Sequence, residues 1–273
     1  MLDRRASDRK RALFRLVGLT LLVTLVGVLP TVSRASTPTA IVTVDFSTTT
    51  ITELEAADWT FFGTNNMPSI TSGGRLRLTT ASPGGQAGSA IYGLAQPTSA
   101  GLRVQFRQEQ LGGSGADGIS FFLVEGSTTV DGPGDSGGGL GYMNLPTIPS
   151  GGALLGVGLD RFGNFSSCVG FGGDSNQALS VRGGFAEGFS EIAGGCLSGR
   201  NWGDPKLVTI EIDPSSAADP KVRVFLDGAL RVQVPQPAAL RAARASSSGS
   251  PPRPAARRTT TTSGTCPSRH SPP

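Results

Sequence analysis

Two short stretches of this sequence carry oxygen-bearing side chains at places where they could bind a ligand. In "SGADGISFFLVEG", residues 114–126, Asp117 stands between small residues and the apolar run 119–124. Acidic residues are depleted in strands and costly to bury unpaired. Asp117 is therefore either a turn-former at the mouth of a strand or a group kept for a ligand, and these residues alone leave both readings open.

The second stretch is "DRFGN", residues 160–164, which spaces Asp160, Phe162 and Asn164 two residues apart. Alternate residues of an extended segment point the same way, so a compact loop could direct two side chains and the Phe162 carbonyl at one hard cation. Oxygen-only ligands suit Ca²⁺. The alternative is a turn in which Asp160 and Asn164 bond only to backbone groups.

The elements that must position these residues are strands. Between residues 36 and 240 we find no convincing amphipathic helix, and short apolar runs are broken by Gly, Pro, Asn or Asp, which is typical of an all-β sandwich. We predict two stacked antiparallel sheets in a jelly-roll arrangement. The predicted strands are 41–46, 75–80, 89–94, 101–109, 119–124, 153–160, 177–182, 207–212, 222–226 and 230–234.

Patterning within the strands predicts how they are buried. The stretch 101–109 alternates apolar and polar residues, so one of its faces should be wet. The runs 119–124 and 153–160 do not alternate, so both of their faces should be covered. Asp227-Gly228 predicts a tight hairpin turn between the last two strands, and the glycine-rich stretch 126–152 predicts a loop that is either functional or disordered.

The two ends of the chain differ from its body. Residues 1–35 combine a basic leader, a short apolar stretch and small residues before Ala35, which predicts a secretory signal peptide; an uncleaved membrane anchor is the alternative. Residues 36–240 hold 11 basic and 18 acidic residues, a net charge of −7. Nothing there favours a nucleic-acid partner, whose backbone demands a basic face. We expect a secreted or cell-surface protein with no membrane span after cleavage.

Three cysteines are present. In an exported protein, Cys168 and Cys196 are a plausible disulfide, and two free buried thiols are the alternative. Cys266 lies in a tail of different composition.

Three motifs occur in a fixed order: "GADGISFFLVEG", then "GGGLGYM" at 137–143, then "LLGVGLDRFGNFS" at 154–166. In this order and spacing they resemble the legume-type (L-type) lectins, especially their exported bacterial relatives. The similarity extends upstream through "WTFFGTN" and downstream through "KLVTIEID", so it covers roughly residues 41–240. It implies a concanavalin A-like fold and a secreted domain that binds a glycan.

The resemblance also implies roles for particular residues. In that family the Asp of Ala-Asp-Gly accepts hydrogen bonds from two sugar hydroxyls and follows a cis peptide bond, which places both features at Ala116-Asp117. Asn164 would donate its amide to the sugar, and Gly138 and Gly139 would supply a backbone N–H donor. Loop flexibility is the alternative for the two glycines.

Calcium is part of the same implied site. Its ligands would be Asp160, the Phe162 carbonyl and Asn164, with Asp174 as the nearest further carboxylate, while the Phe162 ring could stack on an apolar sugar face. The plant proteins hold a second, transition-metal ion with a Glu and a His. Here Gly158 stands at the Glu position and residues 36–240 contain no His, so we expect calcium but no transition metal.

Two other functions compete with sugar binding. Related jelly-roll glycoside hydrolases hold two carboxylates about 5.5 Å apart, usually as Glu-x-Asp-x-x-Glu. The nearest arrangement here, Glu211 and Asp213, lacks the third acid. Without His in the body no Ser-His-Asp or Cys-His set is available, so we expect no enzymatic activity. A structural or adhesive sandwich that binds no sugar is the other alternative.

From residue 241 the composition changes to a Pro-, Ser-, Thr- and Arg-rich tail, which predicts disorder. We interpret 241–273 as the remnant of closing strands after a one-base change of reading frame upstream of Gly249, because the shifted frame permits the Gly-Phe-x-Ala-Ser-x-Gly start that the lectins show there. Cys266 and His270 would then have no function. A genuine linker is the alternative, and the nucleotide sequence of the gene decides between them.

Overall fold

The computed structural model describes residues 41–96, 98, 100–113, 117–166, 168, 176–198, 202–214 and 219–247 of the 273-residue chain. The chain divides into two compact units, residues 1–43 and Val44–Pro273. All helices and strands described below belong to the second unit. The expected signal peptide, residues 1–35, lies outside the described residues.

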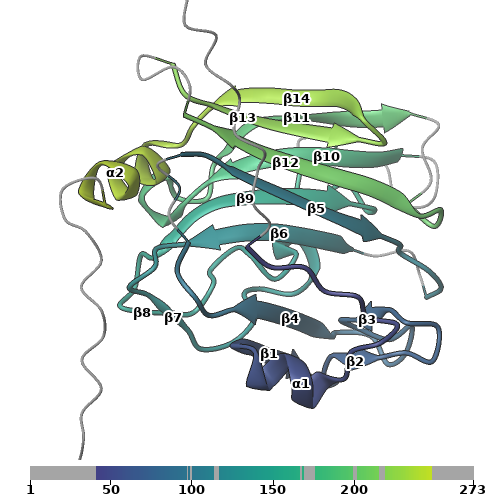
Figure 1. Cartoon of the computed structure of the whole chain (residues 1–273). Helices are drawn as coiled ribbons and strands as arrows, with labels where there is room; N and C mark the ends of the chain where they lie inside the picture. Colours follow the sequence, from purple (N-terminus) through teal and green to yellow (C-terminus); the bar gives the residue numbers. More distant parts are fainter. Residues whose placement is uncertain are drawn as a thin grey trace, which may run out of the picture. The chain divides into compact units, whose positions relative to one another are not determined.

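Two four-stranded antiparallel sheets form the centre of the fold (Figure 1). The first has the strand order β11-β10-β9-β6, with bounds Glu191–Ser198, Asn176–Gly183, Ala153–Asp160 and Gly118–Val124. The second has the order β14-β13-β12-β5, with bounds Ala229–Pro235, Lys221–Leu226, Lys206–Asp213 and Leu102–Gln108. The predicted all-β class is confirmed.

One apolar core joins the two sheets. Leu155 and Val157 of β9 belong to the same buried cluster as Ile210 of β12 and Val224 of β13. Burial of such side chains is the main favourable term in folding, at about 25 cal/mol per Å² of apolar surface. The sheets therefore pack face to face as a β-sandwich.

Smaller elements surround the sandwich. Three two-stranded sheets pair β1 with β4, β2 with β3, and β7 with β8. Their bounds are Trp59–Thr64, Ala87–Tyr92, Ser69–Ile70, Leu76–Arg77, Thr129–Val130 and Thr147–Ile148. The helices are α1 (Ile51–Ala56) and α2 (Ala238–Ser247), with 3-10 turns η1 (Gly137–Gly139) and η2 (Phe185–Glu187).

Strand β9 lies at the centre of the first sheet and is buried along its whole length, as its unbroken apolar run predicted. Its outer face is covered by two aromatic rings. A Cβ at Gly156 would lie 2.4 Å from the ring of Tyr142, and a Cβ at Gly158 would lie 2.2 Å from the ring of Phe165. The two glycines, spaced two residues apart on one face of the strand, therefore leave the room that these rings fill.

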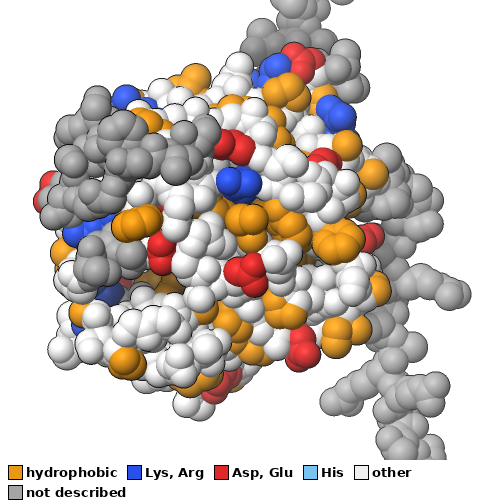
Figure 2. All heavy atoms as spheres, turned by 180° about the vertical axis from the view of Figure 1, so that it is seen from behind, with side chains coloured by type: hydrophobic (Ala, Val, Ile, Leu, Met, Phe, Trp, Pro, Cys, Tyr) orange, Lys and Arg blue, Asp and Glu red, His pale blue; other side chains and the backbone are white. Residues whose placement is uncertain are grey.

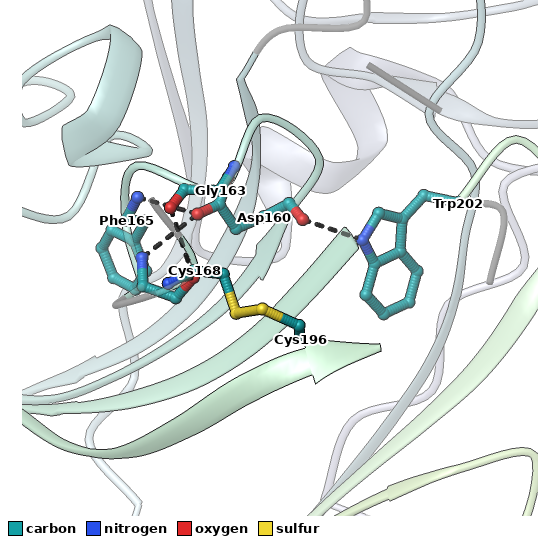
Figure 3. Close-up of a disulfide and its surroundings, with 7 residues drawn as sticks. Asp160, Gly163, Phe165, Cys168, Cys196 and Trp202 are labelled. Carbon is teal, nitrogen blue, oxygen red and sulfur yellow. Dashed lines mark hydrogen bonds between the residues drawn. A yellow bond between two sulfur atoms is a disulfide. The ribbon is translucent and has the colours of Figure 1, made fainter. Parts of the chain in front are cut away.

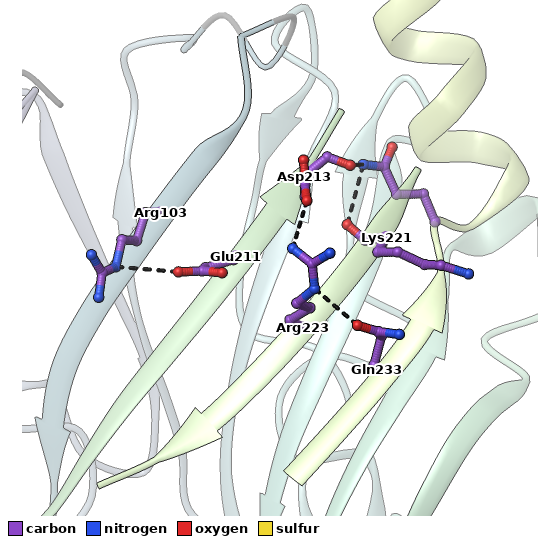
Figure 4. Close-up of polar contacts among 7 residues, drawn as sticks. Arg103, Glu211, Asp213, Lys221, Arg223 and Gln233 are labelled. Atoms are coloured by element: carbon purple, nitrogen blue, oxygen red, sulfur yellow. Dashed lines mark hydrogen bonds and ion pairs between the residues drawn. The ribbon is translucent and has the colours of Figure 1, made fainter. Parts of the chain in front are cut away.

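The second sheet has a polar outer face. Strand β5 alternates between half-buried and exposed residues as predicted. Figure 4 shows the charged residues of this face in pairs: Arg103 with Glu211 at 3.6 Å and Arg223 with Asp213 at 2.5 Å. The carboxylates of Glu211 and Asp213, the nearest approach to a hydrolase motif, are thus each engaged with an arginine. Such surface pairs contribute about 0–1 kcal/mol each.

The hairpin between β13 and β14 turns at Asp227 and Gly228, which have φ angles of +49° and +80°. Two successive residues with positive φ make the turn type that matches the twist of a β-hairpin. The Asp227 carboxylate also accepts a hydrogen bond from the backbone N–H of Leu207 at 3.0 Å. The predicted turn is confirmed.

The strand predictions differ from the structure in three places. Of the predicted strand 75–80, only Leu76–Arg77 forms a strand, β3. Residues 41–46 have the composition of a strand, but no described strand pairs with them, and a strand needs a neighbour to satisfy its backbone groups. Strand β11 was not predicted, because Gly194 and Gly195 interrupt its pattern; its pairing with β10 forms it.

The predicted start of a disordered tail at 241 was also wrong for residues 241–247, which are part of α2. Leu240 is 1% exposed and belongs to the main core cluster. The backbone N–H of Ala239, in the first turn of α2, donates to the carboxylate of Glu187 at 2.8 Å. Such a contact satisfies one of the N–H groups that a helix start leaves free. The rest of the tail lies outside the described residues.

Replacing Leu240 with alanine should lower the free energy of unfolding by about 2–5 kcal/mol, because it removes a fully buried side chain from the core. Leu230→Ala is the matched control, since Leu230 on β14 is 50% exposed. Denaturant unfolding followed by circular dichroism measures both. Equal effects of the two substitutions would show that α2 does not dock on the sandwich.

The face seen in Figure 2 mixes hydrophobic, uncharged and charged side chains. Acidic and basic side chains are scattered over the described part of this face. Among the described residues, none of the helices combines the length and apolar character needed to cross a membrane.

Candidate functional site

The start of β6 and the end of β9 bring the two sequence motifs together. These strands are antiparallel neighbours, and Gly118 is paired with Asp160. Asp117 immediately precedes β6, and Asn164 lies in the loop that follows β9, so both side chains are at the same edge of the sheet. The Nδ2 of Asn164 donates a hydrogen bond to Oδ1 of Asp117 at 3.1 Å. Two residues 47 positions apart in the chain are thus in direct contact.

The turn η1 forms a third side of this site. A Cβ at Gly138 would lie 3.1 Å from the side-chain amide of Asn164, and a Cβ at Gly137 would lie 3.6 Å from Oδ2 of Asp117. Gly139 faces elsewhere, since its Cβ would lie 2.6 Å from the Cβ of Asp135. The structure therefore places Gly138 beside Asn164, while the backbone N–H of Gly139 donates to the carbonyl of Ser136 at 3.4 Å. Gly137 belongs to the site as well; its place in the run of three glycines was the signal for it.

The backbone of Asp117 is fixed to the loop after β9. Its carbonyl accepts hydrogen bonds from the N–H groups of Arg161 at 2.7 Å and Phe162 at 3.1 Å. The guanidinium of Arg161 in turn donates to the carbonyl of Gln110 at 2.7 Å. These contacts hold the acid and the amide side by side on backbone that is itself anchored.

Asp160, the first of the expected calcium ligands, is held by the backbone of its own loop. Its side chain is fully buried, and its carboxylate accepts four backbone hydrogen bonds. Oδ1 accepts from Phe162 at 3.0 Å and Gly163 at 2.7 Å; Oδ2 accepts from Phe165 at 2.7 Å and Ser166 at 3.1 Å. Figure 3 shows Asp160 with Gly163 and Phe165. Asp160 thus bonds the backbone of its own loop, whereas Asn164 bonds the side chain of Asp117.

Two residues that are not part of this loop, Trp202 and Arg182, donate hydrogen bonds to its backbone. The indole N–H of Trp202 donates to the carbonyl of Asp160 at 3.0 Å (Figure 3). The guanidinium of Arg182 donates through Nε to the carbonyl of Phe165 at 2.7 Å, and it lies 4.7 Å from the centroid of the Phe165 ring. It also donates to the carbonyl of Phe189 at 2.8 Å. Both residues act by positioning the loop that carries Asn164.

The segment that carries η1 is anchored by Tyr142. Its hydroxyl donates to the carbonyl of Gly183 at 2.9 Å, and its ring packs on β9. Burial raises the pKa of the Tyr142 phenol far above its ordinary value; the negative charge of Glu187 adds to the increase and the Arg182 cation opposes it. Tyr142 therefore remains a neutral donor. The hydroxyl of Ser120 fixes the same segment by donating to the carbonyl of Leu140 at 2.8 Å.

The site is open to solvent. Asn164 is exposed, Asp117 is half-buried, and the side chain of Phe162 is 42% exposed. An ionised carboxylate accepts hydrogen bonds strongly, and an amide with two N–H groups keeps one after bonding to Asp117. Phe162 adds an exposed ring on the same loop as Asn164. The arrangement can therefore bind a ligand that carries neighbouring hydroxyl groups.

The expected calcium set fits this geometry poorly. Its central member, Asp160, directs its carboxylate at backbone amides, and Asn164 directs its amide at Asp117. Asp174 lies outside the described residues, as does Ala116, so the expected cis bond before Asp117 also falls outside them. Within the described ranges, no group of three or more His, Cys, Asp or Glu side chains could hold a metal ion.

A disulfide lies close to the site. The structure joins Cys168 and Cys196, the pair expected from the sequence, with their Cα atoms 5.6 Å apart (Figure 3). Cys196 is on β11 and Cys168 follows the loop held by Asp160, so the bond ties this loop segment to the edge strand of the first sheet.

A scan of the chain against protein-family models and a search of curated proteins both found no match.

Proposed function

We propose that this chain is a carbohydrate-binding, lectin-like domain of concanavalin A-like jelly-roll architecture, exported from the cell and without catalytic activity. The observation that carries the proposal is the contact between Asp117 and Asn164, a half-buried acid and an exposed amide joined at 3.1 Å on two anchored loops. Such a pair offers an acceptor and a donor within the width of one sugar ring.

The chemistry of the pair suits saccharide hydroxyls. A hydroxyl is both donor and acceptor, so one sugar can donate to the Asp117 carboxylate and accept from the free N–H of Asn164. Gly137 and Gly138 carry no side chain that would keep a sugar away from these groups. The Phe162 ring offers an apolar surface for the C–H face of the sugar.

The competing functions have weaker support. Glu211 and Asp213 are paired with Arg103 and Arg223 on the outer face of the second sheet. A structural or adhesive sandwich that binds no sugar does not require the anchored contact between Asp117 and Asn164. Loss of sugar binding during evolution would nevertheless leave the same fold.

The test is a glycan array probed with the full chain, followed by calorimetric titration with the glycan that binds best. We expect retention on a defined set of mono- or oligosaccharides. Free sugar should compete for the site, so that the apparent dissociation constant rises with the concentration of free sugar. A chain that is folded by circular dichroism but retained on no glycan would belong to the structural or adhesive class.

A further inference from the structure

The loop that presents Asn164 is organised by hydrogen bonds from protein groups to the Asp160 carboxylate and to two loop carbonyls. In many sites an acidic side chain and loop carbonyls converge on Ca²⁺, which then fixes the loop. Here the Asp160 carboxylate and the carbonyls of Asp160 and Phe165 have protein partners instead. This inference rests on the proposed glycan function and concerns how the same site is kept in shape.

The carboxylate of Asp160 is saturated. An ionised carboxylate offers about four lone-pair positions. The backbone N–H groups of Phe162, Gly163, Phe165 and Ser166 occupy them, at 2.7 to 3.1 Å. The N–H of Phe162 is shared with the carbonyl of Asp117. Because Asp160 is fully buried, a cation could reach it only after some of these hydrogen bonds were broken.

Two carbonyls of the loop are also engaged. The carbonyl of Asp160 accepts from the Trp202 indole, and the carbonyl of Phe165 accepts from the Arg182 guanidinium. Arg182 brings a permanent positive charge to the loop and stacks on the Phe165 ring at 4.7 Å. A guanidinium, which is positively charged and has several fixed N–H donors, can bind backbone carbonyls in place of a metal ion.

The space beside β9 is filled in the same way. The Phe165 ring covers Gly158, where a Cβ would lie 2.2 Å from the ring. Gly158 is the position at which a metal-binding Glu would stand in the plant lectins. A side chain there would displace the ring and, with it, the loop that carries Asn164.

We propose that Asp160, Arg182 and Trp202 hold the binding loop in its active shape without a bound cation, so that glycan binding by this protein is independent of calcium. Asp160, Arg182 and Trp202 are positioning residues, since none of them lies where the glycan would. The site of contact remains Asp117 and Asn164.

The first experiment uses the full chain without substitutions. Its melting temperature is measured with EDTA and with millimolar CaCl₂, and the affinity for the best array glycan is measured in the same two buffers. We expect the melting temperature to change by less than about 1 °C, whereas an ion present at about 100 times its dissociation constant would raise it by about 5 °C or more. We expect glycan affinities that agree within about twofold, because neither buffer changes the donors and acceptors that meet the sugar.

A variant tests the role of Asp160 directly. Asp160→Asn replaces one acceptor oxygen with an N–H₂ group that faces backbone donors, so the loop should lose its shape. We expect glycan binding to weaken by about 10-fold or more, with no recovery on adding CaCl₂. Asp204→Asn is the matched control, because that side chain is 68% exposed, and it should bind as the parent does. The near-ultraviolet circular dichroism of both variants shows whether the fold persists.

The outcomes separate the two proposals. Glycan binding that EDTA abolishes, or a clear rise in melting temperature with CaCl₂, would overturn calcium independence and leave the glycan function standing. Should no glycan bind in either buffer, the proposed function fails, and the melting temperature with CaCl₂ still decides whether the chain binds calcium. If Asp160→Asn fails to fold, the measurements on the unsubstituted chain decide the question alone.

Discussion

Replacing Asp117 with alanine is expected to weaken glycan binding by about 100-fold or more. Hydrogen bonds to a charged group contribute about 1.5–3 kcal/mol each, and the substitution removes the acceptor for two sugar hydroxyls. It also frees the Asn164 amide from its 3.1 Å contact with Oδ1 of Asp117. Titration calorimetry with the best array glycan measures the change.

Two further variants show whether the carboxylate itself is responsible. Asp117→Asn keeps the size of the side chain but removes the charge, so it should retain more binding than Asp117→Ala. Glu55→Ala removes an exposed carboxylate on α1 and should leave binding unchanged. Parent-like affinity in Asp117→Ala would show that Asp117 does not contact the glycan.

Replacing Trp202 with alanine should have the largest effect on stability, a loss of about 3–5 kcal/mol in the free energy of unfolding. Trp202 is 1% exposed, belongs to the main core cluster, and donates to the carbonyl of Asp160 at 3.0 Å. The substitution therefore leaves a large cavity between the sheets and an unpaired buried carbonyl. Denaturant unfolding at equilibrium measures the loss.

Trp202→Phe separates packing from the hydrogen bond. The phenyl ring keeps much of the buried surface but lacks the N–H donor, so we expect a smaller loss of about 1–3 kcal/mol together with weaker glycan binding through the displaced loop. The matched control is Trp59→Ala on β1, because Trp59, the other tryptophan of the chain, is only half-buried. If Trp59→Ala cost as much as Trp202→Ala, the special position of Trp202 would be refuted.

Much of the sandwich could be predicted because its strands are marked by side chains. The unbroken apolar run of β9 and the alternation of β5 each follow from which faces are buried, and Asp227-Gly228 marks its turn by the φ angles it permits. The contact between Asp117 and Asn164 was also predictable in outline. It was expected from the resemblance to the lectins, and the antiparallel pairing of β6 with β9 brings the two ends together. Strand β6, which was expected to be covered on both faces, is half-buried along its length.

Other features depend on contacts between distant residues and leave little local mark. Helix α2 lies in an Ala- and Arg-rich stretch whose contacts with the core are made by Leu240 and by the small side chains of Ala239 and Ala243, so its composition favoured disorder. The role of Asp160 could not be read from "DRFGN", because the same spacing serves a metal ligand or a carboxylate that bonds its own loop. Gly156 and Gly158 acquire their meaning only from the rings of Tyr142 and Phe165 that lie on them.

A crystal structure of the full chain with its best-binding glycan tests the central claim most directly. The account predicts a sugar ring at the edge formed by the start of β6 and the end of β9, with hydroxyl oxygens about 3 Å from the Asp117 carboxylate and the Asn164 amide. It also predicts that the backbone hydrogen bonds to Asp160 persist in the complex. A glycan bound elsewhere, with Asp117 and Asn164 turned away from it, would contradict the account.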